Sequence, residues 1–527
     1  AIIALLVLMA VQTKAQRFFN LTAAEVKTDS VVPHFCHTEP LPDNYRDSVY
    51  TVSIAYPEFI DMPATDVSNY RRHHSALPPA MPDLETNIVF NRRKPFISTS
   101  FCPVVYRSGK YQLLVSFLLK REASVKGGAK NSAPKRKADV APAERYAAHS
   151  VLATGKWVKI RVSASGFHQI TESLIRKAGF SDINKVKLYG YGGNLKNEIL
   201  NADDLINSDD LKEVPTYKSG NRRVFYARGP VSWASNTSTV RTRNPYSDYG
   251  YYFLTESADA PSTVDAAAMA ADTYPTPDDF HSHYEVDAYS WYNGGRNLFD
   301  SHSVEPGSSR TVNIAAPNTD GDQKLVVCVS AGRSCVVQVA VNDSIVGTVR
   351  TSLGDSKYIF GCRKSATFTV RNIKADNAVK LTVLDGAAMR LDYITLVSPE
   401  PRPMPDLDSE SLPVPEYVYG ITNQDRHADP QADLVIIIPT SQKLLKQAQR
   451  LKAFHEERDG LRVNIVPADE LYNEFSSGTP DASAYRHYMK MLYDRAADEK
   501  DMPKYLLLFG DCVWDNRMLT PQCRNLN

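Results

Sequence analysis

Three short apolar runs near the end of the chain dominate its pattern of hydrophobic and polar positions. They are Leu434–Ile438, 461–466 and 505–509, which are rich in branched residues and almost free of polar interruption. Runs of this kind predict strands that are buried on both faces of a sheet. Amphipathic patterns that begin near Thr440 and Thr479 separate them and predict helices. The alternation of strand and helix predicts a parallel sheet with helices on its faces.

Each helical pattern carries a boundary signal. Gly460 follows the first pattern, and glycine commonly ends a helix because it adopts a positive φ without a steric cost. Pro480 follows Thr479 at the start of the second pattern, and proline is favoured at the first helical position. Both signals predict where the crossover helices begin and end.

The predicted strands end at Pro439, at 467–469 and at 510–512. Open parallel sheets place ligands and catalytic groups beyond the carboxyl ends of their strands. Three strands are fewer than a doubly wound domain normally contains. Residues 431–527 are therefore predicted to be the first half of an α/β domain whose remaining strands follow Asn527.

Upstream of this block, short strands alternate with turn residues. Between 258 and 399, runs such as 324–330 and 335–341 lie among Asn, Asp and Gly turns, which is typical of a jelly roll. The predicted fold is multidomain and mainly β, with a β-sandwich and then a truncated α/β parallel-sheet domain. The predicted divisions are a signal-peptide remnant (1–15), a β-rich N-terminal domain (16–120), a basic flexible linker (121–150), an α+β domain (151–257), the β-sandwich (258–399), a Pro-rich linker (400–430) and the α/β domain (431–527).

Composition and charge narrow the class of protein. The net charge of +1 argues against nucleic acid as the main partner. The stretch at 121–150 has little apolar content and is predicted to be flexible, with a nucleic-acid arm or a patch for anionic lipid as alternatives. Residues 2–11 form an apolar run that is too short to span a bilayer. This run is predicted to be the remnant of a secretory signal cleaved after Ala15, and a buried core segment is the alternative.

Four cysteine and histidine positions invite a functional interpretation. The chain has seven cysteines and no Cys-x-x-Cys pair. Cys328 and Cys335 are predicted to be buried thiols, with a disulfide across a hairpin as the alternative. His281 and His283 are predicted to be surface histidines, because no third metal ligand follows at a suitable spacing.

Two further features of the sandwich have a plain structural interpretation. Asp320 and Asp322 flank a glycine as in part of a calcium loop, but the remaining oxygen donors are missing, so a turn is predicted. Trp291 and Tyr292 suit a sugar-binding face, but aromatic side chains more often belong to a core. No cofactor is predicted, and a calcium requirement is left open.

The last apolar run continues into a recognisable motif. Residues 503–511 read Pro-Lys-Tyr-Leu-Leu-Leu-Phe-Gly-Asp, and 514–517 read Trp-Asp-Asn-Arg. This stretch resembles the start of the gingipain-type cysteine peptidase domain. The segments at 157–193, 225–230 and 244–254 are similar to the regions that precede this domain in one branch of the family.

The resemblance implies a caspase-like α/β fold. In this family the nucleophilic cysteine and its partner histidine lie on later strands, the histidine in a His-Gly motif. The present chain contains no His-Gly pair. The catalytic dyad is therefore expected beyond Asn527, and the chain by itself is expected to be inactive.

Three residues of the motif are candidate site residues. Asp511 is expected to form a pocket wall or to support the missing histidine, although a carboxylate that caps its own turn fits equally well. Trp514 and Asp515 belong to the motif without an individual role. Cys512 is not predicted to be the nucleophile, because the carboxylate of Asp511 beside it raises the pKa of a thiol.

The family resemblance also implies a biological role. It predicts a secreted cysteine endopeptidase, peripheral to the outer membrane at the cell surface, that removes the C-terminal secretion signal from type IX cargo as a sortase. The implied partners are cargo proteins with that signal, proteins of the outer-membrane secretion and attachment complex, and lipopolysaccharide as acyl acceptor. The alternative is a secreted, non-enzymatic β-sandwich binding or adhesion protein. A hydrolase with another nucleophile is a weaker alternative, because the chain has no Gly-x-Ser-x-Gly elbow.

Overall fold

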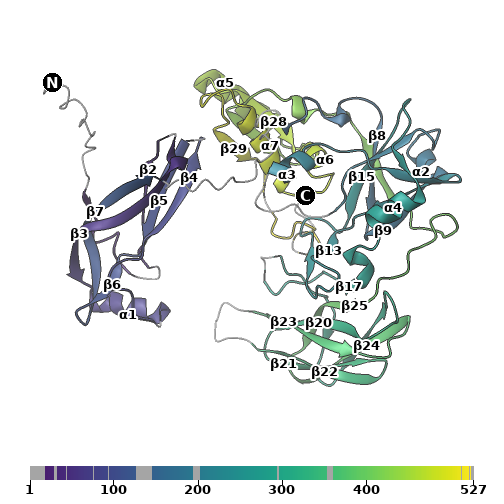
Figure 1. Cartoon of the computed structure of the whole chain (residues 1–527), viewed down its shortest axis with the longest axis horizontal. Coiled ribbons are helices and arrows are strands. Elements are labelled where there is room, and N and C mark those ends of the chain that lie inside the picture. Colours follow the sequence, from purple (N-terminus) through teal and green to yellow (C-terminus); the bar gives the residue numbers. More distant parts are fainter. Residues whose placement is uncertain are drawn as a thin grey trace. The chain divides into compact units, whose positions relative to one another are not determined.

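The computed structural model divides the chain into two compact units, Ala1–Asp139 and Val140–Asn527, which are described separately (Figure 1). It describes residues 18–521 and 523, except for 29–31, 43, 75, 93, 126–144, 194–201, 293–295, 353–359 and 512. The predicted signal-peptide remnant and residues 126–144 of the predicted basic linker lie outside the described residues.

The first unit contains two antiparallel sheets that share an aromatic core. Phe35, Phe101 and Phe117 come from both sheets, and the rings of Phe35 and Phe117 meet edge to face at 5.0 Å. One sheet contains β1 (Phe18–Asn20), β7 (Lys110–Val125), β3 (Ser48–Asp61) and β6 (Val104–Arg107), and the other contains β2 (Phe35–Pro40), β5 (Lys94–Phe101) and β4 (Glu85–Asn91). The helices are η1 (Tyr45–Asp47) and α1 (Ala64–His73).

The second unit begins with an α+β region built on two four-stranded sheets. One contains β10 (Val186–Tyr189), β15 (Gly250–Glu256), β8 (Trp157–Val162) and β26 (Glu416–Ile421), and the other contains β16 (Thr263–Val264), β11 (Thr216–Ser219), β12 (Arg222–Ala227) and β9 (Gly166–Thr171). A separate ribbon pairs β13 (Val231–Trp233) with β14 (Arg241–Arg243). The helices are η3 (Val151–Ala153), α2 (Glu172–Lys177), α3 (Ala202–Asn207) and α4 (Ala266–Thr273). Strand β26 comes from the segment predicted as a Pro-rich linker, and it pairs with β8.

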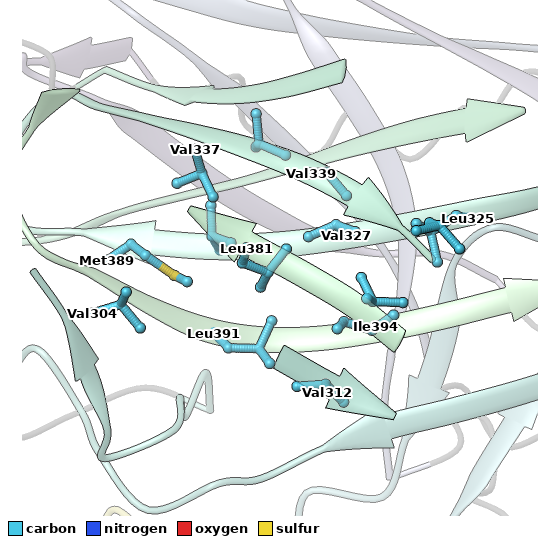
Figure 2. Packing of buried hydrophobic residues seen from close by; sticks show 14 of the residues in the cluster. Val304, Val312, Leu325, Val327, Val337, Val339, Leu381, Met389, Leu391 and Ile394 are labelled. Carbon is cyan, nitrogen blue, oxygen red and sulfur yellow. The ribbon is translucent and has the colours of Figure 1, made fainter. Parts of the chain in front are cut away.

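A β-sandwich follows, and each of its two sheets is antiparallel. The strands are β17 (His281–Glu285), β25 (Met389–Val397), β20 (Gln323–Ala331), β23 (Cys362–Val370) and β18 (Ser303–Val304) in one sheet, and β19 (Ser309–Ala315), β24 (Asp376–Gly386), β21 (Cys335–Val341) and β22 (Ser344–Thr351) in the other. The short helix η4 (Pro277–Phe280) precedes β17. Figure 2 shows the core, where Val327 and Ile394 of one sheet pack near Val337 and Leu381 of the other. Alternation of buried and exposed residues along β19 and β24 produces one side of this core, whereas β20 and β25 are buried along almost their whole length.

Two of the three cysteines of the sandwich are buried. Cys328 and Cys335 are both buried and free, which confirms that they are buried thiols. Burial raises the pKa of Cys335, and burial followed by the charge of Asp392 raises the pKa of Cys328. Both thiols are therefore held in their protonated, unreactive form.

The α/β region forms the parallel sheet that the apolar runs predicted. Strands β28 (Val463–Pro467) and β29 (Tyr505–Leu508) both pair in parallel with the central strand β27 (Leu434–Ile438). The helices are η5 (Arg426–Ala428), α5 (Leu445–Asp459), α6 (Ala468–Phe475) and α7 (Ser483–Arg495). The C-cap of α5 is Gly460 with φ 64°, as its position after the amphipathic pattern predicted.

Both crossover helices begin later than their sequence signals indicated. Helix α5 starts at Leu445 because Gln442 adopts a positive φ in a turn closed by its backbone N–H to the carbonyl of Pro439. Helix α7 starts at Ser483, whose N–H is capped by the carboxylate of Asp481. The predicted starts at Thr440 and Thr479 were therefore wrong by about one turn, and α6, directly after β28, was not predicted.

One expectation of burial was also wrong. The central strand β27 is buried along its whole length, but Tyr505, Leu506 and Leu508 of β29 are 57%, 45% and 49% exposed. Within the described residues, β29 pairs only with β27 and forms an edge of the sheet. An apolar run reports a preference for burial, whereas burial itself depends on which elements lie next to the strand.

Candidate functional site

The candidate site is a cleft of about 760 Å³ at the carboxyl edge of the parallel sheet. Strand ends form one side, and residues 246–251 of the α+β region, which lead into β15, form the other. The lining residues are Tyr246, Ser247, Asp248, Tyr249, Tyr251, Ile437, Ile438, Pro439, Thr440, Ser441, Ala468, Tyr472, Pro480, Tyr485, Leu508, Phe509, Gly510, Asp511, Val513, Asn516, Arg517 and Met518. Open parallel sheets place ligands beyond the carboxyl ends of their strands, and all three parallel strands end at this edge. The cleft therefore lies where the sequence predicted a site.

Tyrosine side chains make up much of the cleft wall. The rings of Tyr472 and Tyr485 stack with their centroids 5.6 Å apart, and their hydroxyl groups are hydrogen bonded to each other. Burial, followed by the neighbouring Tyr485, raises the pKa of Tyr472, so its hydroxyl stays protonated. Aromatic walls with polar tips suit an extended polypeptide, which offers both apolar side chains and backbone hydrogen-bonding groups.

The three predicted site residues lie at or beside this cleft. Asp511 is exposed and lines it. Trp514 and Asp515 line a smaller neighbouring cavity together with Arg517. Cys512 lies outside the described residues. Among the described residues, the cleft lining includes no cysteine and no histidine.

Asp515 holds the turn that follows the sheet. Its carboxylate accepts hydrogen bonds from the backbone N–H groups of Arg517 at 3.2 Å and Thr520 at 2.7 Å. Its carbonyl accepts a third from the N–H of Met518 at 3.0 Å. The side chain is buried, so the two bonds from Arg517 and Thr520 satisfy a carboxylate that is removed from water. Residues 515–520 therefore form a locally rigid turn at the cleft.

Arg517 extends from this turn into the neighbouring regions. Its Nη1 donates to Asp248 of the α+β region at 2.7 Å, and its Nη2 donates to Asp287 of the sandwich at 2.6 Å. Arg517 belongs to the motif at 514–517, but the sequence alone predicted no role for it. Its partners lie more than two hundred residues upstream, so spacing along the chain carries no signal for them.

A dense network of arginines and carboxylates surrounds Asp287. Glu285, Asp287 and Asp392 have ligand atoms within 4.8 Å of one another, which is a spacing that a metal ion could use. These carboxylates are already bound by guanidinium groups, which come from Arg241, Arg243, Arg363 and Arg517. The donor set is therefore neutralised by fixed positive charges and does not fit a calcium ion.

The prediction of surface histidines was wrong. His281 is buried, and its ring stacks on Trp233 with centroids 4.0 Å apart. His283 is largely buried, with Nδ1 2.9 Å from the hydroxyl of Thr395 and Nε2 3.1 Å from Glu285. Strand β17 places both rings between the sandwich and the β13–β14 ribbon. Burial lowers the pKa of both histidines, which favours the neutral ring.

Two predictions about the sandwich remain, namely the turn near Asp320 and the aromatic pair Trp291 and Tyr292. The first is confirmed and the second is wrong in part. Residues 318–321 form a turn in which the side chain of Asn318 accepts the N–H of Asp320, as the turn interpretation predicted. The aromatic pair differs from the prediction. Trp291 is partly buried and bonds to Ser330, whereas Tyr292 is 51% exposed and lies outside the core.

A buried imidazole joins the α+β region to the α/β region. His427 of η5 has Nδ1 2.6 Å from Glu474 of α6 and Nε2 3.2 Å from Asp209, and its ring stacks on Phe475. Burial opposes the charge, but the hydrogen bonds to Asp209 and Glu474 raise the pKa of His427 to about 10. The imidazolium is therefore the stable form at neutral pH, held between two carboxylates.

A second buried basic side chain crosses the same boundary. Lys159 of β8 donates to the carbonyl of Gly478 at 2.6 Å, and its Nζ lies 4.3 Å from the ring centre of Tyr251 in the cleft wall. Burial lowers the pKa of Lys159 to about 7. These contacts hold the turn between α6 and α7 against the sheet that carries Tyr251.

Comparison with known proteins identifies this arrangement. Residues 427–526 match the family model described as Peptidase family C25, and the match spans the parallel sheet, its helices and the turn at Arg517. The α/β region is thus a domain of the gingipain family of peptidases. Among curated proteins, none matches the chain.

Over a longer stretch, the chain is similar to PorU from Porphyromonas gingivalis. The solved structure of dimeric latent PorU matches with 27% identity and a TM-score of 0.58, over 72% of this chain and 44% of that chain. The chain therefore spans less than half the length of the PorU chain it matches. A family 35 carbohydrate binding module from Clostridium thermocellum matches with 15% identity and a TM-score of 0.17, over 22% of this chain and 92% of that chain.

Proposed function

We propose that the chain is the N-terminal part of a secreted gingipain-family cysteine endopeptidase that acts as the C-terminal signal peptidase and sortase of a type IX secretion system. The observation that carries the proposal is the cleft at the carboxyl edge of the C25 sheet. The similarity to PorU supports the finer assignment to this branch of the family.

In the proposed mechanism, a cysteine thiolate attacks the scissile carbonyl and forms a thioester while a histidine moves the proton to the leaving amine. Water or an amine of lipopolysaccharide then takes the acyl group. The nucleophile and the base would lie beyond Asn527, on strands that extend the sheet next to β29. The residues of this chain would contribute the tyrosine-lined wall and the turn at 515–520, which bind and orient the polypeptide.

The proposed setting is the cell surface, with the protein peripheral to the outer membrane and in contact with proteins of the secretion and attachment complex. Among the described helices, none has the length and apolar character needed to cross a bilayer. In this setting the β domains would hold cargo and partner proteins, while the α/β domain would carry the chemistry.

The direct test uses the protein with the residues encoded downstream of Asn527. It is incubated with a cargo fusion that ends in its C-terminal secretion signal, and the products are identified by mass spectrometry. We expect removal of the signal, and transfer of the cargo to an added amine, both abolished by a thiol-alkylating agent. Binding of the cargo without cleavage would support the non-enzymatic binding protein instead.

A further inference from the structure

Arg517 lies where three parts of the second unit meet. It lines the cleft, the small cavity beside Trp514 and a cavity of about 170 Å³ between the sandwich and the β13–β14 ribbon. Its side chain is only 5% exposed. A buried guanidinium is stable only when carboxylates compensate its charge, so its partners fix its position.

The partners form a closed ring of charges. Arg517 and Arg243 both bind Asp248, at 2.7 and 2.5 Å, and both approach Asp287, at 2.6 and 3.1 Å. Asp287 is buried beside the end of β17, and Asp248 lies in the turn that lines the cleft. Two guanidinium groups thus share the same two carboxylates, and this arrangement links the sandwich, the α+β region and the α/β region.

The rigid turn at 515–520 connects this network of ion pairs to the wall of the cleft. Asp515 fixes the backbone of Arg517, Met518 and Thr520 through three hydrogen bonds. Asn516, Arg517 and Met518 all line the cleft. Because the turn is internally rigid, a shift of the Arg517 side chain moves this part of the wall together with it.

We propose that Arg517 is a positioning residue of the cleft, and that it makes the geometry of the cleft wall depend on the β-sandwich through Asp287 and on the α+β region through Asp248. The proposal deepens the proposed function, because it assigns control of the same cleft to the sandwich. A ligand or partner that displaces the end of β17 would then change the cleft without touching it.

The first test does not require catalysis. Hydrogen exchange is measured by mass spectrometry on the full chain and on D287N, in peptides covering 513–521 and 246–251. We expect exchange in both peptides to increase by about tenfold or more, because loss of the Asp287 ion pair releases the turn from its neighbours and lets it open as a unit. The matched control is D300N, which breaks a similarly buried pair with Arg310 inside the sandwich, away from the cleft.

The D300N control distinguishes a specific effect of Asp287 on the turn from a general destabilisation of the sandwich. Unchanged exchange at 513–521 in D287N would overturn the proposal, and so would an equal increase in D300N. R517K keeps the charge but not the two-pronged geometry, so it should lie between the wild type and R517Q. If R517Q fails to fold, the D287N and R517K results still decide the question.

The second test uses the longer protein and its cargo. D287N should lower kcat by about 10- to 100-fold with little change in KM, because misplacement of the wall affects orientation more than binding. D300N should leave both constants unchanged. Absence of cleavage in the wild type would contradict the proposed function, whereas the exchange result would still test the positioning role.

Discussion

Replacement of His427 by glutamine should destabilise the second unit strongly. The imidazole is fully buried between Glu474, at 2.6 Å, and Asp209, at 3.2 Å, and Glu474 itself is fully buried. Glutamine cannot supply the positive charge, so two carboxylates would face each other without compensation. Removal of one partner from a buried ionic group costs about 3–5 kcal/mol, and we expect a loss of this size.

The stability of the wild type should also depend on pH through His427. The folded pKa of about 10 lies above the unfolded value of about 6.5, so the stabilisation is fully present below pH 6.5 and is lost as the pH rises through 10. A difference of about 3.5 pH units corresponds to about 5 kcal/mol.

The assay is urea-induced unfolding of the full chain at several pH values, followed by far-ultraviolet circular dichroism. The matched control is H455Q, which removes a partly exposed histidine paired with Asp459 one helical turn away and should cost less than about 1 kcal/mol. A loss below about 1 kcal/mol for H427Q would refute the reasoning. A difference between wild type and H427Q that stays constant from pH 6.5 to pH 10 would refute it as well.

Three further predictions use the same unfolding assay or the exchange experiment. Burial lowers the pKa of Lys159 to about 7 from an unfolded value near 10.5. The free energy of unfolding of the wild type should therefore rise by about 3–5 kcal/mol relative to that of K159M between pH 7 and pH 10.5. A difference between the two proteins that does not change with pH would contradict this. L381A should lower the free energy of unfolding by about 2–5 kcal/mol, because the side chain of Leu381 is fully buried in the sandwich. L384A changes a residue on the same strand that is 51% exposed, and it should lower the free energy of unfolding by less than about 1 kcal/mol. Similar losses in the two variants would contradict the packing in Figure 2. D287N should free the turn at 513–521 and D300N should not, as described above.

Local signals in the sequence predicted much of the α/β region. The three apolar runs became three parallel strands, and Gly460 ended its helix with a positive φ, because both features depend on neighbouring residues. Helix α6 was missed because it is only eight residues long. The signal that could have found it is Asp469 with Glu470 in the first turn, since acidic residues are favoured there.

The interactions that join the regions could not be predicted. His427 meets Asp209, and Arg517 meets Asp248 and Asp287, across separations of more than two hundred residues. A buried charge is stable only with its partner, and the partner is known only once the chain has folded. The same reason explains His281 and His283, which were predicted at the surface because the sequence shows no third metal ligand near them. The cleft was predicted because the rule for parallel sheets depends on strand direction and not on particular contacts.

The proposed function places the nucleophilic cysteine of this domain after Asn527. The most direct measurement is labelling of the longer protein with a thiol-reactive peptide probe that mimics the cleavage site, with the adduct mapped by mass spectrometry. We expect one adduct, on a cysteine encoded downstream of Asn527, and we expect prior alkylation to block cargo cleavage. An adduct on Cys512, or on any other of the seven cysteines of this chain, that tracks with loss of cleavage would contradict it.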